Sequence, residues 1–189
     1  MSKIRFKGEQ KKSTHLQEKL RLRMDVLPDA PLLVVDAFSA DEEIWSAIRR
    51  QRKFPTKVIR IEKGKDHCGF FLWGDNLKFL PEIVEHAKPD AVDLDAYGVP
   101  FAQMQLLRDL RYSGMVFATA ILSKIASLPN AMLRDLEISD AMIRDGSRLI
   151  TYQFYDLILE WLNKNGATDI RAIRKEDSLR KMYLSYRLN

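Results

Sequence analysis

The sequence predicts an α/β domain: a mostly parallel seven-stranded sheet with helices on both faces and an antiparallel hairpin at its C-terminal end. Short apolar runs alternate with amphipathic segments, which is the pattern of strands joined by crossover helices. The last two strand-like segments are joined by a short polar stretch that leaves no room for such a helix. With 189 residues, 46% of them hydrophobic, the chain is long enough to bury one sizeable core.

The N-terminal part is expected to hold an arm, a helix and a buried strand. Residues 1–13 are polar and basic, which predicts a flexible arm ahead of a single domain over residues 14–189. Within residues 14–24, apolar side chains recur at i, i+4 and i+8 while most cations lie on other faces, so we expect a helix. Residues 32–36 are a continuous apolar run ending in Asp36, which is typical of a strand buried on both faces.

The middle of the chain predicts two helices and three strands. Ser39 and Glu42 form a capping-box pattern ahead of a helix with an apolar face. A second helix is expected over residues 77–87, which carry an apolar stripe. Short apolar runs predict strands over residues 58–62, 70–73 and 91–95.

The C-terminal part continues the alternation and then departs from it. A helix that includes Phe101 precedes a fifth strand over residues 114–120. Residues 154–164 carry an apolar stripe at i, i+3, i+4, i+7 and i+8 and stop before an Asn-Gly pair, so they predict a helix. The hairpin strands are expected over residues 169–174 and 181–187.

Composition excludes several classes of protein. A single cysteine, Cys68, excludes an internal disulfide framework and is typical of a reducing compartment. No Cys and His cluster has metal-site spacing, and no apolar run approaches the roughly 18 residues of a membrane span. There is no glycine-rich dinucleotide loop, no Walker-type phosphate loop and no nucleophile elbow. We therefore expect a cytoplasmic protein without a metal or a membrane partner.

The net charge of +5 is concentrated at the two ends of the chain. Residues 1–24 hold eight Lys or Arg against two Glu, and residues 171–189 hold six against two acids. A basic end binds phosphates by releasing counterions, but it is equally suited to be a solvated tail. The candidate nucleic-acid contacts are Lys3, Arg5, Lys7, Lys11, Lys12, Arg21 and Arg23.

Acidic residues follow four of the predicted strands: Asp36, Glu62, Asp75 and Asp95. In an open α/β sheet, ligands bind beyond the carboxyl ends of the strands, so these acids are expected to face one crevice. An acid after the second strand can accept hydrogen bonds from both hydroxyls of a ribose. The alternative is that each acid caps the helix that follows it.

Four segments resemble the motifs of class I S-adenosylmethionine-dependent methyltransferases, and the resemblance covers residues 14–187. Residues 36–42, DAFSADE, stand where the family has an acid-x-aromatic-x-Gly-x-Gly loop. Glu62 matches the ribose-binding acid, and residues 74–76, Gly-Asp-Asn, match the adenine-side motif. Residues 93–100, Asp-Leu-Asp-Ala-Tyr-Gly-Val-Pro, resemble the Asp-Pro-Phe-Gly-Ser-Pro signature of tRNA guanine-N2 dimethyltransferases and are related to the Asn/Asp-Pro-Pro-Tyr motif of base-amine methyltransferases. The wider run is similar to small phage- and mobile-element-borne methyltransferases.

This resemblance implies a Rossmann-like methyltransferase fold and S-adenosylmethionine as cofactor. It also implies an exocyclic amine of a nucleic-acid base as methyl acceptor, with RNA favoured over DNA, as in tRNA modification. Asp95 would accept the N–H of the amine with help from the Ala96 carbonyl, and Tyr97 would stack on the base. The implied cofactor-binding residues are Asp36, Phe38, Ala40, Glu42, Glu62, Asp75, Asn76 and Asp93.

Two of the motifs depart from the family pattern. Ala40 and Glu42 replace both glycines of the first loop, so side chains stand where backbone should approach the cofactor. Ala96 replaces the proline that usually follows the catalytic acid. Two other functions therefore stay open: a catalytically impaired protein of the same fold that binds nucleic acid or a protein partner, and a methyltransferase for a small molecule or a protein.

Overall fold

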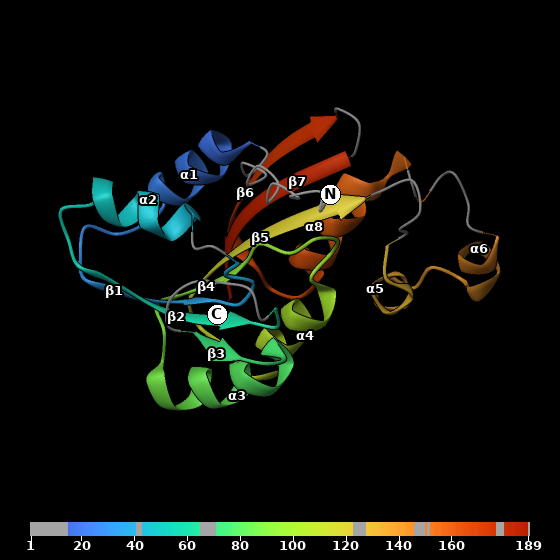
Figure 1. Ribbon diagram of the computed structural model, residues 1–189. Helices are drawn as coiled ribbons and strands as arrows, with labels where there is room; N and C mark the ends of the chain where they lie inside the picture. Colours follow the sequence, from blue (N-terminus) through green and yellow to red (C-terminus); the bar gives the residue numbers. More distant parts are fainter. Residues whose placement is uncertain are drawn as a thin grey trace, which may run out of the picture.

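The computed structural model describes residues 15–40, 43–64, 71–122, 128–145, 150, 152–176 and 180–188. The predicted arm over residues 1–13 therefore lies outside the described residues. Strands and helices alternate through most of the described chain, as the sequence pattern predicts. Figure 1 shows most of these elements gathered around one twisted sheet, with α6 lying away from it.

The described residues form a seven-stranded sheet in the order β3-β2-β1-β4-β5-β7-β6. Each strand overlaps a predicted strand segment, and the central strands β1, β4 and β5 are continuous apolar runs because they are buried on both faces. The strands are β1 Leu32–Asp36, β2 Thr56–Glu62, β3 Leu72–Trp73, β4 Ala91–Leu94, β5 Met115–Leu122, β6 Thr168–Glu176 and β7 Arg180–Arg187.

The C-terminal hairpin is confirmed, and it makes the sheet mixed rather than mostly parallel. Strands β1 to β5 pair in parallel, whereas β7 forms antiparallel pairs with β5 on one side and β6 on the other. The short connection between β6 and β7 permits only this reversal of direction.

Helices cover both faces of the sheet. Figure 1 shows α1 and α2 on one face and α3 and α4 on the other. Alternate strand residues point to opposite faces, so Val34 packs with α1 and α2 while Val35 packs in the cluster that holds α3, α4 and α8. The described helices are α1 Leu16–Met24, α2 Glu43–Gln51, α3 Asn76–Ala87, α4 Phe101–Asp109, α5 Asn130–Asp135, α6 Asp140–Arg144 and α8 Phe154–Lys164.

Two local features differ from the sequence expectations, and a third lies partly outside the described residues. The short helices α5 and α6 lie between β5 and α8, where the sequence pattern predicts no element. The hydroxyl of Ser39 is buried without a hydrogen-bond partner among the described residues, and residues 41 and 42, which complete the predicted capping box, lie outside them. Helix α1 buries Lys19 and Arg23, which the pattern of apolar residues had placed away from the core.

No helix in the described part of the chain is both long enough and apolar enough to cross a membrane.

Candidate functional site

The fold brings three of the predicted acids together at the carboxyl ends of adjacent strands. Asp36 ends β1 and is the register partner of Asp93 on β4. Asp95 follows directly after β4. Asp36 and Asp93 are buried, and the Asp95 side chain is 18% exposed. Burying three carboxylates in one place is costly unless cations or donors lie beside them.

Asp93 forms a buried ion pair with helix α1. The Nε and Nη2 atoms of Arg23 donate to the two carboxylate oxygens at 2.8 and 2.6 Å. The indole Nε1 of Trp45 donates to the same carboxylate at 2.7 Å. Since Arg23 and Asp93 are both only 1% exposed, Asp93 holds the α1 layer in place, and this geometry gives no support to its expected contact with a cofactor.

Asp95 is paired with a cation one turn earlier on the same helix. The Nζ atom of Lys19 lies 2.7 Å from Oδ1 and 2.8 Å from Oδ2 of Asp95. The hydroxyl of Thr119 on β5 donates to Oδ1. Burial raises the pKa of Asp95, but the charges of Lys19 and Arg23 and the hydrogen bonds from Lys19 and Thr119 outweigh it. The pKa of Asp95 therefore lies below its ordinary value, and the carboxylate is ionised at neutral pH.

Asp36 is the third acid of this cluster, and the site favours its neutral form. Burial, with the charges of Asp93 and Asp95, raises the pKa of Asp36 well above its ordinary value. Burial also raises the pKa of Asp93, against the opposing charge of Arg23. With Asp36 protonated, the two remaining carboxylates would face the two cations Lys19 and Arg23.

The expectation that Arg23 contacts nucleic acid is wrong for this structure. The Arg23 side chain is buried against Asp93 and cannot reach a phosphate, because leaving would expose an unpaired buried carboxylate. Arg21, by contrast, has a side chain that is 80% exposed and remains a candidate contact. The other candidate contacts lie outside the described residues: Lys3, Arg5, Lys7, Lys11 and Lys12.

A small cavity beside the acidic cluster collects four of the eight predicted cofactor-binding residues. Its volume is about 180 Å³. It lies where the ends of β1, β2 and β3 meet the start of α3. Its lining residues are Ala37, Phe38, Glu62, Lys63, Gly74, Asp75, Asn76 and Gln103. Phe38, Glu62, Asp75 and Asn76 were all expected there from the motifs, so the structure brings these four together.

Glu62 organises the loops that form this cavity. One of its carboxylate oxygens accepts the backbone N–H groups of Lys63 and Gly64 at 2.8 and 2.9 Å. The other oxygen accepts the N–H of Ala40 at 2.8 Å. Ala40 has a φ of 38°, in the left-handed region that glycine adopts most readily. The loop thus has a backbone shape suited to glycine at the position where the sequence has Ala40. Glu42, the other altered position, lies outside the described residues.

Asp75 and Asn76 have structural bonds as well as a place in the cavity. Asp75 caps α3 by accepting the N–H of Leu77 at 3.0 Å, as the alternative interpretation of the acids expects. Asn76 is buried and donates to the carbonyl of Ala37 at 2.8 Å, and Gln103 donates to its side-chain oxygen. These bonds hold the loops after β1 and β3 at a fixed separation.

The segment after β4 exposes its aromatic residue completely. Tyr97 is 98% exposed, whereas the adjacent Ala96 is buried. Gly98 has a φ of 118°, which L side chains rarely adopt, and its carbonyl accepts the N–H of Ile121 on β5. This turn carries Tyr97 outward beside Asp95, so its ring is free to stack on a planar group.

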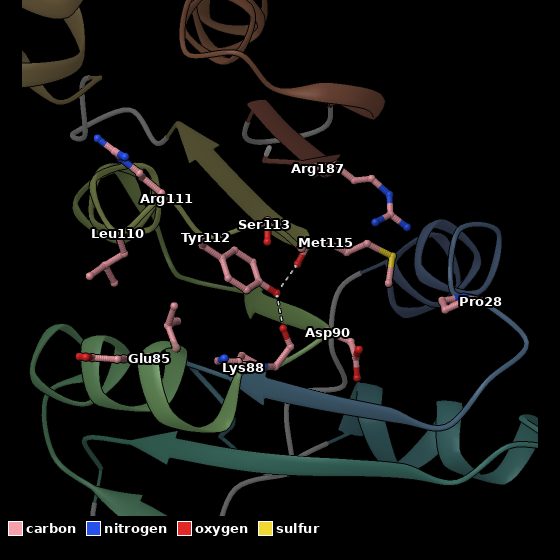
Figure 2. Close-up of a pocket in the computed structure, with 13 residues that line it drawn as sticks. Pro28, Glu85, Lys88, Asp90, Leu110, Arg111, Tyr112, Ser113, Met115 and Arg187 are labelled. Atoms are coloured by element: carbon pink, nitrogen blue, oxygen red, sulfur yellow. Dashed lines mark hydrogen bonds between the residues drawn. The ribbon is translucent and has the colours of Figure 1, made fainter.

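A larger cavity of about 650 Å³ lies at the opposite, amino end of the parallel strands. Figure 2 shows Tyr112 in its wall. The Tyr112 hydroxyl lies 3.1 Å from the carbonyl oxygen of Pro89 and 3.4 Å from that of Met115. The lining of the cavity also includes Glu85 and Arg187 but none of the residues that the motifs single out. Its size does not make it the functional site, because ligands of this fold class bind at the carboxyl edge.

Sequence reasoning missed the partners of the acids. Lys19, Thr119, Trp45 and Gln103 all bond predicted site residues. The sequence held one signal for these ion pairs. Lys19 and Arg23 are spaced by one helical turn, which is close to the distance between Asp93 and Asp95, two residues apart on an extended chain.

No family model matches the sequence, and no curated protein matches it. Many solved structures resemble this fold, and three of them illustrate the likeness. A candidate hemolysin from Streptococcus thermophilus matches over 97% of this chain and 70% of its own, with 13% identity and a TM-score of 0.56. Precorrin-6y C5,15-methyltransferase from Geobacter metallireducens matches over 96% of this chain and 93% of its own, with 11% identity and a TM-score of 0.51. A candidate methyltransferase from Escherichia coli matches over 96% of this chain and 88% of its own, with 10% identity and a TM-score of 0.50. At such identities the likeness shows the fold alone: this chain shares the α/β fold of these structures, two of which are named as methyltransferases.

Proposed function

We propose that the protein is an S-adenosylmethionine-dependent methyltransferase that acts on an exocyclic amine of a nucleic-acid base, in RNA rather than DNA. The observation that carries the proposal is the convergence of Phe38, Glu62, Asp75 and Asn76 on one cavity at the carboxyl edge of the sheet, the edge at which Asp95 and the exposed Tyr97 follow β4.

The cavity residues fit the nucleoside part of the cofactor. Glu62 presents a fixed carboxylate suited to ribose hydroxyls, and Asp75 and Asn76 present polar groups suited to an adenine edge. A volume of about 180 Å³ is below the roughly 300–1,000 Å³ of typical ligand sites, so it matches a part of the cofactor. The unpartnered buried hydroxyl of Ser39 lies in the same loop and would gain a partner from a bound polar group.

The chemistry assigns separate roles to Asp95 and Tyr97. When bound, S-adenosylmethionine supplies an electrophilic methyl group on a sulfonium. Asp95 accepts an N–H of the amine and stabilises the positive charge that develops on its nitrogen. Because the pKa of Asp95 lies below its ordinary value, this carboxylate is a weak base, and the released proton passes to water. Tyr97 stacks on the base and holds its amine at the site.

The catalytic role is tested by comparing Asp95→Ala and Glu62→Ala. Asp95→Ala should lower methyl transfer about a hundredfold or more with little change in cofactor affinity, the scale of losing one preorganised electrostatic group. Glu62→Ala should weaken cofactor affinity first, because a ribose contact is made equally in the ground and transition states. If the two variants weakened S-adenosylmethionine affinity equally, the assignment of Asp95 to catalysis and Glu62 to cofactor binding would be contradicted.

The nucleic-acid partner is tested by deleting residues 1–12, which removes five cations. RNA binding should weaken across all sequences, and its dependence on salt should flatten, because fewer counterions are released. Arg21→Met should act in the same direction, since Arg21 is exposed. If the salt dependence of RNA binding did not change, residues 1–12 would be a solvated tail and not a nucleic-acid contact.

A second candidate function has its own support. Ala40 stands in a backbone conformation suited to glycine, and Lys19 already occupies the carboxylate of Asp95. Both features suit a protein that keeps the fold for binding and no longer catalyses. Failure of the natural chain and of a variant with glycine at positions 40 and 42 to bind S-adenosylmethionine would favour this candidate.

A further inference from the structure

Two donors fix the carboxylate of Asp95 in one orientation. Lys19 Nζ bonds both oxygens at 2.7 and 2.8 Å, and the Thr119 hydroxyl bonds Oδ1. Within the described part of the chain, Oδ1 thus receives two donors and Oδ2 receives one. Since each carboxylate oxygen offers two lone pairs, the open acceptor position lies on Oδ2.

Lys19 is itself held by the next turn of its helix. Arg23 Nη1 donates to the Lys19 carbonyl at 3.0 Å while its other nitrogens bond Asp93. The Lys19 side chain is 11% exposed, and its Nζ lies 5.5 Å from the centre of the Tyr183 ring on β7. The ammonium group therefore has little freedom to leave Asp95.

We propose that Lys19 is a positioning residue of the methyl-acceptor site: with Thr119 it orients Asp95 so that Oδ2 takes the N–H of an uncharged amine. This inference rests on the proposed function and deepens it, because it identifies the residue that orients Asp95 and gives a reason why the amine must be uncharged. It also makes helix α1 a part of the site and not merely its cover.

The same geometry selects against a charged acceptor. An N–H donor on Oδ2 lies close to the Lys19 ammonium, which bonds the same oxygen. A second ammonium, such as a protein lysine, is repelled there by its like charge. An exocyclic base amine is uncharged, because its lone pair is delocalised into the ring, and it meets no such repulsion.

Several charged groups act on Asp95, and the test must separate them. Lys19 and Arg23 approach from α1, and Asp93 and Asp36 approach from β4 and β1. Strand β5 contributes only the uncharged Thr119. Among the cations, Lys19 does most to lower the pKa of Asp95, so its removal should shift that pKa upward.

The test measures the pKa of the Asp95 carboxyl by carbon-13 NMR in the free protein, for the natural chain, Lys19→Met and Lys19→Arg. Lys19→Met keeps the apolar stem and should raise the pKa, whereas Lys19→Arg should keep it low. Arg21→Met is the matched control, because it removes an exposed cation from the same helix and should leave the pKa unchanged. Thr119→Val, which removes the donor to Oδ1, provides a second variant if Lys19→Met fails to fold.

Kinetics with a base amine and with a lysine peptide complete the test. Lys19→Met should lower kcat on the base amine about a hundredfold, the cost of a misplaced group, with KM for S-adenosylmethionine unchanged. Lys19→Met should also lower the ratio of kcat/KM for the base amine to kcat/KM for the lysine peptide, and Lys19→Arg should restore most of kcat.

A Lys19→Met enzyme that is faster than the natural one would overturn the proposal, because Lys19 would then block the site. An unmoved Asp95 pKa would overturn it as well. If the natural chain methylates no amine, the proposed function fails, while the NMR result still decides whether Lys19 sets the state of Asp95.

Discussion

The pair between Arg23 and Asp93 is the most deeply buried ion pair in the described part of the chain, and it ties α1 to the sheet. Two charges at 1% exposure are tolerated only because Arg23 bonds both oxygens and Trp45 adds a third donor. Removing one partner leaves an uncompensated buried charge, which is far more costly than losing a surface contact.

Arg23→Met should therefore lower the free energy of unfolding by about 3–5 kcal/mol. Arg21→Met, two residues away on the same helix, should change it by no more than about 0.5 kcal/mol, because Arg21 is exposed. Urea denaturation of the two variants measures both values. Similar small losses in both would mean that the buried pair does not anchor α1.

Asp36 makes stability depend on pH in a definite direction. The folded state raises its pKa, so folding takes up a proton wherever the unfolded Asp36 is ionised. The contribution of Asp36 to the free energy of unfolding is therefore fully present below its ordinary pKa of about 4. Above that pH it falls by about 1.4 kcal/mol per pH unit, until the pH reaches the raised pKa of the folded state.

Asp36→Asn removes this ionisation. The variant should be more stable than the natural chain near neutral pH, and its advantage should vanish as the pH falls toward about 4. Thermal unfolding of both proteins across that range gives the difference. A difference that does not change with pH would show that folding leaves the pKa of Asp36 at its ordinary value.

At the scale of elements, α1 and β4 match in spacing. Lys19 and Arg23 lie four residues apart on a helix, about 6 Å along its axis. Asp93 and Asp95 lie two residues apart on an extended chain, about 6.6 Å. Each cation therefore meets one acid, although neither partner is near the other in sequence.

This match explains which parts of α1 the sequence predicted. The helix itself is confirmed, because apolar residues recur at helical spacing. The prediction of which face of α1 is buried was wrong. Hydrophobic periodicity assigns Lys and Arg side chains to solvent, and it cannot detect acids that approach from a strand distant in sequence. Similarly, α5 and α6 carry too short a pattern to be recognised; α6 buries none of its residues.

The loop between β1 and α2 gives a prediction at the same scale. Ala40→Gly should stabilise the protein by about 1 kcal/mol, because an L residue is strained in the left-handed region that Ala40 occupies. Ala102→Gly, at an exposed position inside α4, should instead cost about 0.5–1 kcal/mol. Melting temperatures compare the two. If Ala40→Gly is destabilising as well, the loop is not held in a glycine conformation.

For the whole molecule, the strands, the hairpin and the carboxyl edge followed from the sequence more securely than the chemistry of the site; the order of the strands was not predicted and comes from the structure. Continuous apolar runs predicted β1, β4 and β5, and the short connection predicted the hairpin of β6 and β7. The motifs brought Phe38, Glu62, Asp75 and Asn76 to one cavity. They could not show that Asp93 and Asp95 are paired with cations, because that depends on how α1 docks.

The central claim is that the cavity at the carboxyl edge, and not the larger one at the amino edge, binds S-adenosylmethionine. Calorimetry of S-adenosylmethionine binding to the natural chain, Glu62→Ala and Glu85→Ala tests it directly. Glu62 lines the first cavity and Glu85 the second. We predict binding at one site, weakened at least about tenfold by Glu62→Ala, because a charged hydrogen-bond partner is lost, and unchanged by Glu85→Ala. Absence of binding to the natural chain, or weakening by Glu85→Ala alone, would contradict the claim.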